Sequence, residues 1–273
     1  MLIDCKSISN EIDANTKDTL SKTSVKAKLV SFAVAPDSGT ISYLKSQKKK
    51  ASSLGIEYEM IIATDVDELK ALLKRCSKDS SVHGIFVSHP LPDKESELEI
   101  VQLVNPNKDI EGRNPNNLGM LIYGHEQFSP CTAQAVIEIL ERSTSIMGKK
   151  ATIIGRSPTV GMPVSLMLLK RERSATVTVC HTKTRNLQAI TKDSDIVIVA
   201  VGRAGFLKPE MVKEGAIVID VGINVVEGKI VGDVDNKVQE KAWITPVPGG
   251  VGSITTSVLM NRVALNAARS DKI

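Results

Sequence analysis

Several features that would mark a specialised class of protein are scarce in this sequence. Aromatic residues make up only 3% of its 273 residues, so the core is expected to consist of aliphatic side chains. The cysteines form no Cys-x-x-Cys pair, which argues against a zinc site or a disulfide framework and favours reduced thiols in a cytosol. They are Cys5, Cys76, Cys131 and Cys180. The longest apolar run, IVIVAV at 196–201, is too short to cross a bilayer.

Patterns for metal and nucleic-acid binding are scarce as well. The four histidines lack ligand spacing, so no metal is predicted; they are His83, His89, His125 and His181. The net charge is +4, from 35 basic and 31 acidic residues, and no basic stripe with interleaved aromatics is present. No nucleic-acid partner is therefore expected, although a small anionic ligand would suit this charge. The polar start MLIDCKSISNEID is unlike a signal peptide, so neither secretion nor membrane attachment is expected.

Short aliphatic runs alternate with segments of helical periodicity along the chain. Near-continuous Val/Ile runs are typical of strands buried on both faces, and the alternation predicts an α/β fold with parallel sheets. The predicted strands are 28–35, 57–64, 84–89, 151–155, 176–181, 195–202 and 216–222, and the predicted helices are 66–76, 132–143, 164–172 and 253–268.

The order of these elements predicts two domains. The first spans 1–130 together with a C-terminal helix at about 253–273, and the second spans 131–252. The stretch SYLKSQKKKASSLGI at 42–56 is predicted as a basic helix of the first domain.

The segment GRSPTVGMP at 155–163 follows one predicted strand directly and opens a helix. Gly155 permits a tight turn, Gly161 lets the backbone approach a pyrophosphate at the helix N-terminus, and Pro163 suits the first turn. Because Ser157 replaces the middle glycine of the common G-x-G-x-x-G pattern, the turn alone is also compatible with a plain β–α connection. Three further strands follow, and this setting favours dinucleotide binding.

The end of the second strand of this domain indicates which dinucleotide is bound. It reads CHTKT at 180–184, without the acidic residue that usually binds the ribose 2′-hydroxyl of NAD. Arg156, Thr182 and Lys183 would instead donate to a 2′-phosphate. The sequence therefore favours NADP over NAD.

Glycine-containing segments are predicted at the carboxyl edge of the same sheet. AVGR at 200–203 and DVGIN at 220–224 place Gly202 and Gly222 where ligands lie in open α/β folds. The loop TPVPGGVGSIT at 245–255 is rich in proline and glycine, so its backbone is stiff and can approach a ligand closely. An interdomain turn is the alternative interpretation of this loop.

Taken together, these stretches resemble the bifunctional methylenetetrahydrofolate dehydrogenase/methenyltetrahydrofolate cyclohydrolase family. The resemblance runs nearly end to end, in the family's order and close to its spacing. The motifs that carry it are SGTISYLKSQKKK, HGIFVSHPLP, NKDIEGRNPNNLG, SPCTAQAV, GRSPTVGMP, AVGRAGF, IDVGIN, GDVD and TPVPGGVGSIT.

The resemblance implies an N-terminal α/β domain, a Rossmann-like NADP domain and a folate substrate in the cleft between them. It further implies a cytoplasmic homodimer acting in one-carbon metabolism, in tetrahydrofolate interconversion and purine biosynthesis. The implied reactions are oxidation of 5,10-methylenetetrahydrofolate by NADP and hydrolysis of the methenyl product to 10-formyltetrahydrofolate.

Two positions depart from the family's catalytic pattern. Tyr43 matches the active-site tyrosine, but the catalytic lysine four residues later is Gln47, and the glutamine that partners this lysine is Ser88. Glu111 matches the pterin-binding aspartate, and its carboxylate can accept paired hydrogen bonds from the pterin edge. Asp109 matches a neighbouring aspartate that we interpret as structural.

Three interpretations of these departures remain open. The dehydrogenase survives while the cyclohydrolase is weak or absent, because hydride transfer needs alignment more than an ammonium. Alternatively Lys50, roughly 20° from Tyr43 around the helix, replaces the missing lysine, or His89 handles protons. In the third interpretation the chain binds folate or nucleotide with little catalysis. An unrelated two-domain dehydrogenase is disfavoured, because the sequence has no dedicated His–carboxylate pair.

The predicted site residues form three sets. The catalytic set is Tyr43, Gln47, Lys50, Ser88 and Glu111. The substrate-binding set is Tyr43, Pro90, Leu91, Glu111, Gly250 and Ile254. The cofactor-binding set is Gly155, Arg156, Ser157, Val160, Gly161, His181, Thr182, Val201, Gly202, Gly222, Ile223 and Asn224.

Overall fold

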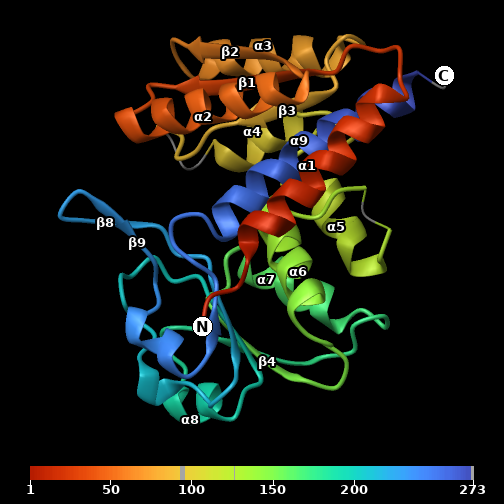
Figure 1. Cartoon of the computed structure of the whole chain (residues 1–273). Coiled ribbons are helices and arrows are strands. Elements are labelled where there is room, and N and C mark those ends of the chain that lie inside the picture. The colour runs from red at the N-terminus through yellow and green to blue at the C-terminus, as the bar shows by residue number, and fades with distance from the viewer. Residues whose placement is uncertain (93–95, 126, 272–273) are drawn as a thin grey trace. The chain divides into compact units, whose positions relative to one another are not determined.

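The structure is a computed structural model that describes residues 1–92, 96–125 and 127–271. The chain forms two compact units (Figure 1). One unit comprises Glu11–Cys131 and Thr256–Ile273, and the other comprises Met1–Asn10 and Thr132–Thr255. The predicted two-domain α/β architecture is confirmed.

The first ten residues group differently from the predicted boundary, because they pair with the sheet of the second unit. The Ile3 backbone N–H donates to the Ile244 carbonyl at 2.9 Å, and the Ile244 N–H donates to the Met1 carbonyl at 3.0 Å. The N-terminal residues therefore extend that sheet beyond its edge strand.

The unit of Glu11–Cys131 and Thr256–Ile273 is built on a three-stranded parallel sheet in the order β2-β1-β3. Its strands are β1 (Lys28–Val34), β2 (Glu57–Ala63) and β3 (Gly84–Val87), and its helices are α2 (Ser38–Leu54), α3 (Val66–Lys78), α4 (Glu97–Leu103) and α5 (Pro115–Tyr123). Three longer helices contribute residues to both units: α1 (Cys5–Ser21), α6 (Cys131–Ser143) and α9 (Val251–Ser270).

The central strand β1 separates two different environments. Val30 and Phe32 pack in one hydrophobic core with Leu69 and Leu73 of α3. Ser31 lies between Val30 and Phe32, and its side chain points to the opposite face because side chains alternate along a strand. There it bonds to a side chain of α2, so α2 and α3 cover opposite faces of the sheet.

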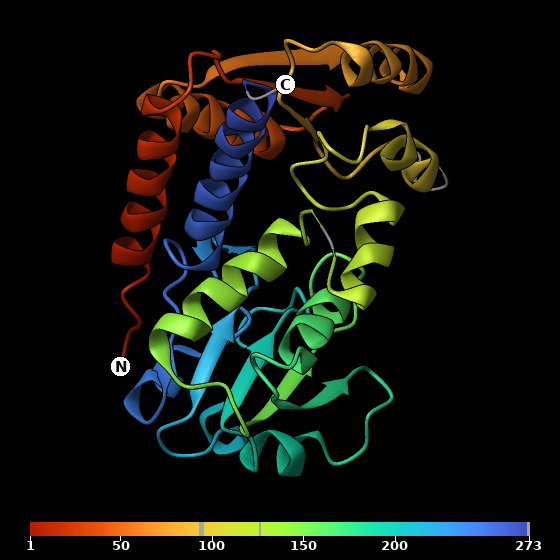
Figure 2. The same ribbon diagram turned by 90° about the vertical axis from the view of Figure 1, so that its right-hand side faces the viewer.

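The other unit contains a five-stranded parallel sheet in the order β10-β7-β6-β4-β5 (Figure 2). Its strands are β4 (Lys150–Ile154), β5 (Thr176–Cys180), β6 (Ile196–Val199), β7 (Ile217–Asp220) and β10 (Trp243–Ile244). Helices α7 (Gly161–Leu169) and α8 (Leu187–Lys192), the 3-10 turns η1 (Pro209–Met211) and η2 (Asn236–Glu240), and the hairpin β8 (Asn224–Val226) and β9 (Lys229–Val231) complete it.

The chain order in this sheet creates a switch point. From β4 the chain passes to β5 on one side and then returns to β6 on the other side. The loops that follow β4 and β6 therefore diverge at the carboxyl edge, which is where open α/β sheets bind ligands. Within the described residues, no helix is both long and apolar enough to be a membrane span.

The predicted strands each overlap a strand of the structure, whereas several helices begin elsewhere. The helix predicted at 164–172 lies at Gly161–Leu169, and the basic helix predicted at 42–56 lies at Ser38–Leu54. Its start is fixed by Asp37, whose side chain accepts from the Thr40 N–H at 2.7 Å. Its end is fixed by Gly55, which has the left-handed φ of 83° that favours glycine.

Candidate functional site

Helix α2 buries one stripe of residues against β1, and Gln47 lies on this stripe with Leu44, Ala51 and Leu54. Its side chain is 0% exposed. The hydroxyls of Ser31 and Tyr58 both donate to Gln47 Oε1, each at 3.2 Å. Gln47 is thus a buried polar group whose oxygen is fixed by two neighbouring strands.

The amide nitrogen of Gln47 is in a different situation from its oxygen. Nε2 is buried and finds no hydrogen-bond partner among the described residues. An unpaired buried donor costs about 1–3 kcal/mol. The Tyr43 hydroxyl contacts the Gln47 side chain, which places this buried amide beside the predicted active-site tyrosine.

Tyr43 lies one helical turn before Gln47 on α2. The residue is 38% exposed, and its ring packs on Phe86 of β3 with centroids 5.9 Å apart. Burial of the phenol raises the pKa of Tyr43 to about 12, while contacts with Gln47 and Thr256 act in the opposite direction. Tyr43 therefore stays neutral at physiological pH and can donate a proton in a hydrogen bond.

Lys50 is directed elsewhere. Its ammonium forms an ion pair with the Asp13 carboxylate of α1. The other lysines of the helix, Lys45, Lys48 and Lys49, are exposed. None of the four lysines belongs to the buried stripe that carries Gln47, and the Lys50 ammonium is paired with Asp13.

The Glu111 carboxyl lies where the segment after α4 approaches β3. The backbone N–H of Val87 donates to Glu111 Oε2 at 3.4 Å. Burial raises the pKa of Glu111 to about 7, an effect that the nearby Arg113 guanidinium opposes. The group therefore changes its charge close to neutral pH.

Asp109 fixes the backbone around Glu111, as its structural interpretation requires. Its carboxylate accepts from the Gly112 N–H at 3.1 Å, the Asn114 N–H at 2.7 Å and Asn117 Nδ2 at 3.0 Å. These bonds hold the turn that presents Glu111.

The motif after β3 adds a buried serine and a largely buried histidine. Ser88 is buried, and its N–H continues the sheet by donating to the Phe32 carbonyl at 2.8 Å. Neither ring nitrogen of His89 finds a hydrogen-bond partner among the described residues. Burial, and secondarily the charge of Arg113, lowers the pKa of His89 to about 3. His89 is thus neutral at physiological pH, which disfavours it as a proton donor.

Pro90 and Leu91 complete this motif. The His89–Pro90 peptide bond is cis. Pro90 is exposed, whereas Leu91 is buried in the core beside α3.

The sequence did not identify Ser31 and Tyr58, the two partners of Gln47, as residues of the site. A serine within the apolar run KLVSFAVA was a usable signal for Ser31.

The turn after β4 is shaped by two glycines in close contact. A Cβ on Gly155 would lie 2.3 Å from the Ala200 carbonyl oxygen, and one on Gly161 would lie 2.1 Å from the Gly155 oxygen. Only glycine allows the start of α7 to pack this tightly on the turn. The start of α7 thus lies against the turn after β4 at the switch point, where the positive end of the helix dipole suits an anion such as a pyrophosphate.

Ser157 and Val160 form the turn itself. The Val160 N–H donates to Ser157 Oγ at 3.1 Å, and the Met162 N–H donates to the Ser157 carbonyl at 3.1 Å. Arg156 and Thr182 are both exposed, the first after β4 and the second after β5. The His181 N–H donates to Thr184 Oγ1 at 2.9 Å, so the loop after β5 is ordered by its own side chains.

In the glycine-containing loops after β6 and β7, backbone N–H groups already donate hydrogen bonds within the protein. The N–H groups of Val201 and Gly202 donate to the Asp233 carboxylate, as does Asn224 Nδ2. Ile223 is well exposed. Of the remaining predicted residues, Gly250 and Ile254 are buried near the start of α9. Asp233 belongs to the GDVD stretch, and the sequence alone predicted no role for this residue.

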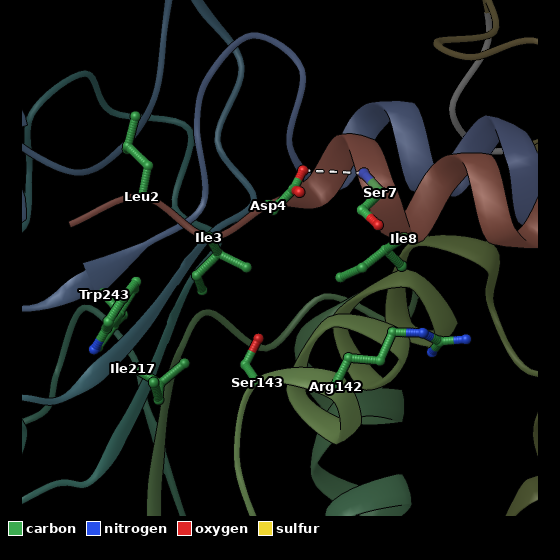
Figure 3. Close-up of a pocket in the computed structure, with 9 residues that line it drawn as sticks. All are labelled: Leu2, Ile3, Asp4, Ser7, Ile8, Arg142, Ser143, Ile217 and Trp243. Carbon is green, nitrogen blue, oxygen red and sulfur yellow. Dashed lines mark hydrogen bonds between the residues drawn. The ribbon is translucent and has the colours of Figure 1, made fainter.

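A separate pocket of about 410 Å³ opens at the amino ends of β7 and β10 (Figure 3). It is lined by Leu2, Ile3, Asp4, Ser7, Ile8, Arg142, Ser143, Ile217 and Trp243. Ile217 and Trp243 each begin their strand, so the pocket lies at the opposite edge of the sheet from the glycine loops. It is therefore distinct from the predicted nucleotide site.

Two family models match the chain. The catalytic domain of tetrahydrofolate dehydrogenase/cyclohydrolase matches residues 3–111, and the NAD(P)-binding domain of the same enzymes matches residues 130–271. The chain belongs to the tetrahydrofolate dehydrogenase/cyclohydrolase family. The resemblance inferred from the sequence motifs is thereby confirmed.

Individual members of this family are similar over their full lengths. The bifunctional protein FolD of Pseudothermotoga lettingae is 66% identical over 271 residues, 99% of each chain. The crystal structure of the bifunctional FolD enzyme of Campylobacter jejuni has a TM-score of 0.91 and 39% identity, covering 100% of this chain and 98% of that one. The Trypanosoma brucei enzyme, solved with NADP and an inhibitor, has a TM-score of 0.90 and 30% identity, covering 98% and 97%.

Proposed function

We propose that the protein oxidises 5,10-methylenetetrahydrofolate to the 5,10-methenyl compound with NADP, and hydrolyses the product to 10-formyltetrahydrofolate. The observation that carries this proposal is the family match over both parts of the chain, with relatives that are named bifunctional. The Tyr43–Gln47–Glu111 group and the tight turn at Gly155 supply the corresponding chemistry in this chain.

The turn after β4 would receive NADP. Gly155, Ser157, Val160 and Gly161 bring the start of α7 to the phosphates, and the exposed Arg156 would meet the 2′-phosphate together with Thr182. When bound, NADP in its oxidised form supplies the hydride acceptor. The family's NAD(P)-binding description and the NADP complex of the Trypanosoma brucei enzyme support this assignment.

The folate is proposed to contact the group around Tyr43. The Glu111 carboxylate would accept two hydrogen bonds from the amino-pyrimidine edge of the pterin, and the ring of Tyr43, a residue that is 38% exposed, would pack along the pterin. Gln47 is 0% exposed and contacts the Tyr43 hydroxyl, so it would act on the folate through Tyr43. Pro90, Leu91, Gly250 and Ile254 remain predicted substrate contacts.

The charges around Tyr43 and Gln47 favour the oxidation. Loss of a hydride leaves a cationic amidinium, so a nearby carboxylate stabilises the transition state and a nearby ammonium opposes it. Here Gln47 is neutral, and the Lys50 ammonium is paired with Asp13. The Glu111 carboxyl carries negative charge above pH 7. This environment suits hydride transfer.

The same features favour a second candidate function, a dehydrogenase with a weak cyclohydrolase. Hydrolysis begins with water attacking the amidinium carbon, and the step profits from a group that transfers protons and stabilises charge on oxygen. An ammonium at position 47 would do both, whereas the Gln47 amide donates and accepts hydrogen bonds but does not transfer protons. His89 stays neutral, because burial lowers its pKa.

A two-part spectrophotometric assay tests both candidates. Purified protein with methylenetetrahydrofolate and NADP is expected to form NADPH, and the absence of turnover with NADP and with NAD would contradict the proposed function. The methenyl absorbance then separates the two candidates. Rapid decay indicates a working cyclohydrolase, and persistent accumulation indicates a dehydrogenase that releases its product unhydrolysed.

Replacing Arg156 with alanine tests the choice of cofactor. We expect KM for NADP to rise about 10-fold or more, because a charge-assisted bond to the 2′-phosphate is lost. KM for NAD should stay within about 2-fold, since NAD lacks this phosphate. Initial rates with each cofactor at saturating folate measure both values, and an equal rise for both would assign Arg156 to another part of the site.

The setting of the reaction follows the family. We propose that residues 1–130, with the helix at 253–273, form the folate part and residues 131–252 the NADP part, apart from the first ten residues noted above. We also propose a cytoplasmic homodimer that acts in one-carbon metabolism and supplies purine biosynthesis. Light scattering on the purified protein tests the dimer, and a monomer mass would contradict it.

A further inference from the structure

The Asp233 carboxylate lies at the centre of the loop that follows β6. It is 0% exposed. Oδ2 accepts from the N–H groups of Val201 and Gly202 at 2.7 and 2.9 Å, and Oδ1 accepts from the Arg203 N–H at 2.8 Å and from Asn224 Nδ2 at 2.9 Å. Three successive N–H groups that converge on one point form a typical anion-binding nest. In this chain the nest is filled by the protein's own carboxylate.

A second buried carboxylate fixes Asp233 in turn. Asp220, the last residue of β7, accepts from the N–H groups of Gly222, Asp233 and Val234, each at 2.9 Å. A Cβ on Gly222 would lie 2.2 Å from the Asp233 carboxyl group, so glycine is required there by Asp233 itself. The two aspartates connect the end of β7 to the loop after β6.

This loop borders the turn in which NADP is proposed to bind. Ala200, its first residue, has its carbonyl oxygen only 2.3 Å from where a Cβ on Gly155 would lie. Because the N–H groups of Val201, Gly202 and Arg203 are all bonded to Asp233, the loop has none of these donors left for a phosphate. Its contribution must come from its shape, its carbonyl oxygens and its side chains.

We propose that Asp233 is a positioning residue for the nicotinamide cofactor. It sets the conformation of residues 200–203 before the cofactor arrives, so that binding does not have to order the loop. The proposal rests on the NADP-dependent function proposed above. It also assigns the phosphates to the turn at 155–161 and excludes them from the loop after β6.

Replacing Asp233 with asparagine tests the role, because one accepting oxygen becomes an NH2 group that faces N–H donors. We expect KM and Kd for NADP to rise roughly 10- to 100-fold. KM for methylenetetrahydrofolate, measured at saturating NADP, should stay within about 3-fold. If Asp233 were important only for folding, the substitution would not raise KM for NADP while leaving KM for methylenetetrahydrofolate nearly unchanged.

Asp195→Asn is the matched control. Asp195 directly precedes β6, at the end of the strand opposite to the loop 200–203. Its carboxylate accepts from the Lys150 N–H at 3.0 Å and from Lys213 Nζ at 2.6 Å. The same substitution there removes a comparable acceptor without touching the loop, and KM for NADP should not change. An equal rise in both variants, or no rise in Asp233→Asn, would overturn the proposal. Emission from Trp243, the only tryptophan, confirms that each variant is folded.

Hydrogen exchange on the unmodified protein decides the question if Asp233→Asn does not fold. The amides of Val201, Gly202 and Arg203 are expected to be protected without NADP, because Asp233 already binds them. If they exchange freely and become protected only when NADP is added, the proposal is wrong. Failure of the parent protein to form NADPH would instead contradict the proposed function, and the exchange result would still decide what Asp233 does.

Discussion

Replacing Gln47 with lysine is expected to speed hydrolysis of the methenyl compound by about 10²- to 10⁴-fold, the usual contribution of a well-placed general acid–base. The hydroxyls of Ser31 and Tyr58, which now donate to Gln47 Oε1, would accept from the new ammonium. Burial would lower the pKa of the lysine toward neutrality, where it transfers protons best. Decay of methenyl absorbance measures the effect.

The oxidation is expected to respond in the opposite direction. A cation beside the developing amidinium raises the barrier to hydride loss, so formation of NADPH should slow in Gln47→Lys. Gln47→Met is the matched control, since it has similar length and no charge, and it should not speed hydrolysis. If the parent protein already hydrolyses the methenyl compound as fast as Gln47→Lys, the hypothesis that glutamine at position 47 weakens hydrolysis is wrong. Slower decay in Lys50→Ala would then identify Lys50 as the cation that acts in hydrolysis.

Replacing Glu111 with glutamine is expected to raise KM for methylenetetrahydrofolate by roughly 10- to 100-fold, with little change in KM for NADP. Glutamine offers one acceptor where the carboxylate offers two, so the paired bonds to the pterin edge cannot both form. Glu99→Gln is the control, because Glu99 pairs with Lys70 at the surface. A similar KM in all three proteins would remove Glu111 from the folate site.

The pH dependence of KM provides an independent check on Glu111. Burial raises its pKa from an ordinary value of 4.5 to about 7. Below pH 7 the carboxyl becomes protonated and loses acceptor capacity, so KM of the parent protein should rise as the pH falls through 7. The Glu111→Gln variant should lack this inflection, and KM curves of the same shape would contradict the assignment.

The same shift predicts a change in stability. A carboxyl whose pKa is higher in the folded than in the unfolded chain binds its proton more tightly when folded. Its contribution therefore favours folding at low pH and is lost as the pH rises from about 4.5 to about 7. The Glu111→Gln variant avoids this loss, so its free energy of unfolding should gain on that of the parent protein across this range. Urea unfolding at several pH values measures the difference.

Much of the architecture was determined by the sequence alone. Near-continuous Val and Ile runs need burial on both faces, and only parallel strands covered by helices provide it, so the strands were placed correctly before any contact was known. The turn at Gly155 and Gly161 followed from local chemistry, since a strand, a tight turn and a helix start lie within a few consecutive residues. The departure at Gln47 was likewise visible from its spacing to Tyr43.

Contacts between distant segments were decided only by the tertiary structure. Helical geometry placed Lys50 near the face of Tyr43. In the structure, the Lys50 ammonium instead forms an ion pair with Asp13, which is 37 residues earlier. Ser31 and Tyr58 come from separate strands, and no local pattern brings them to Gln47. Asp233 reaches its loop across 30 residues or more. Periodicity and turn chemistry act over a few residues, whereas the partner of a buried polar group depends on which strands become neighbours, and that is known only once the sheet has formed.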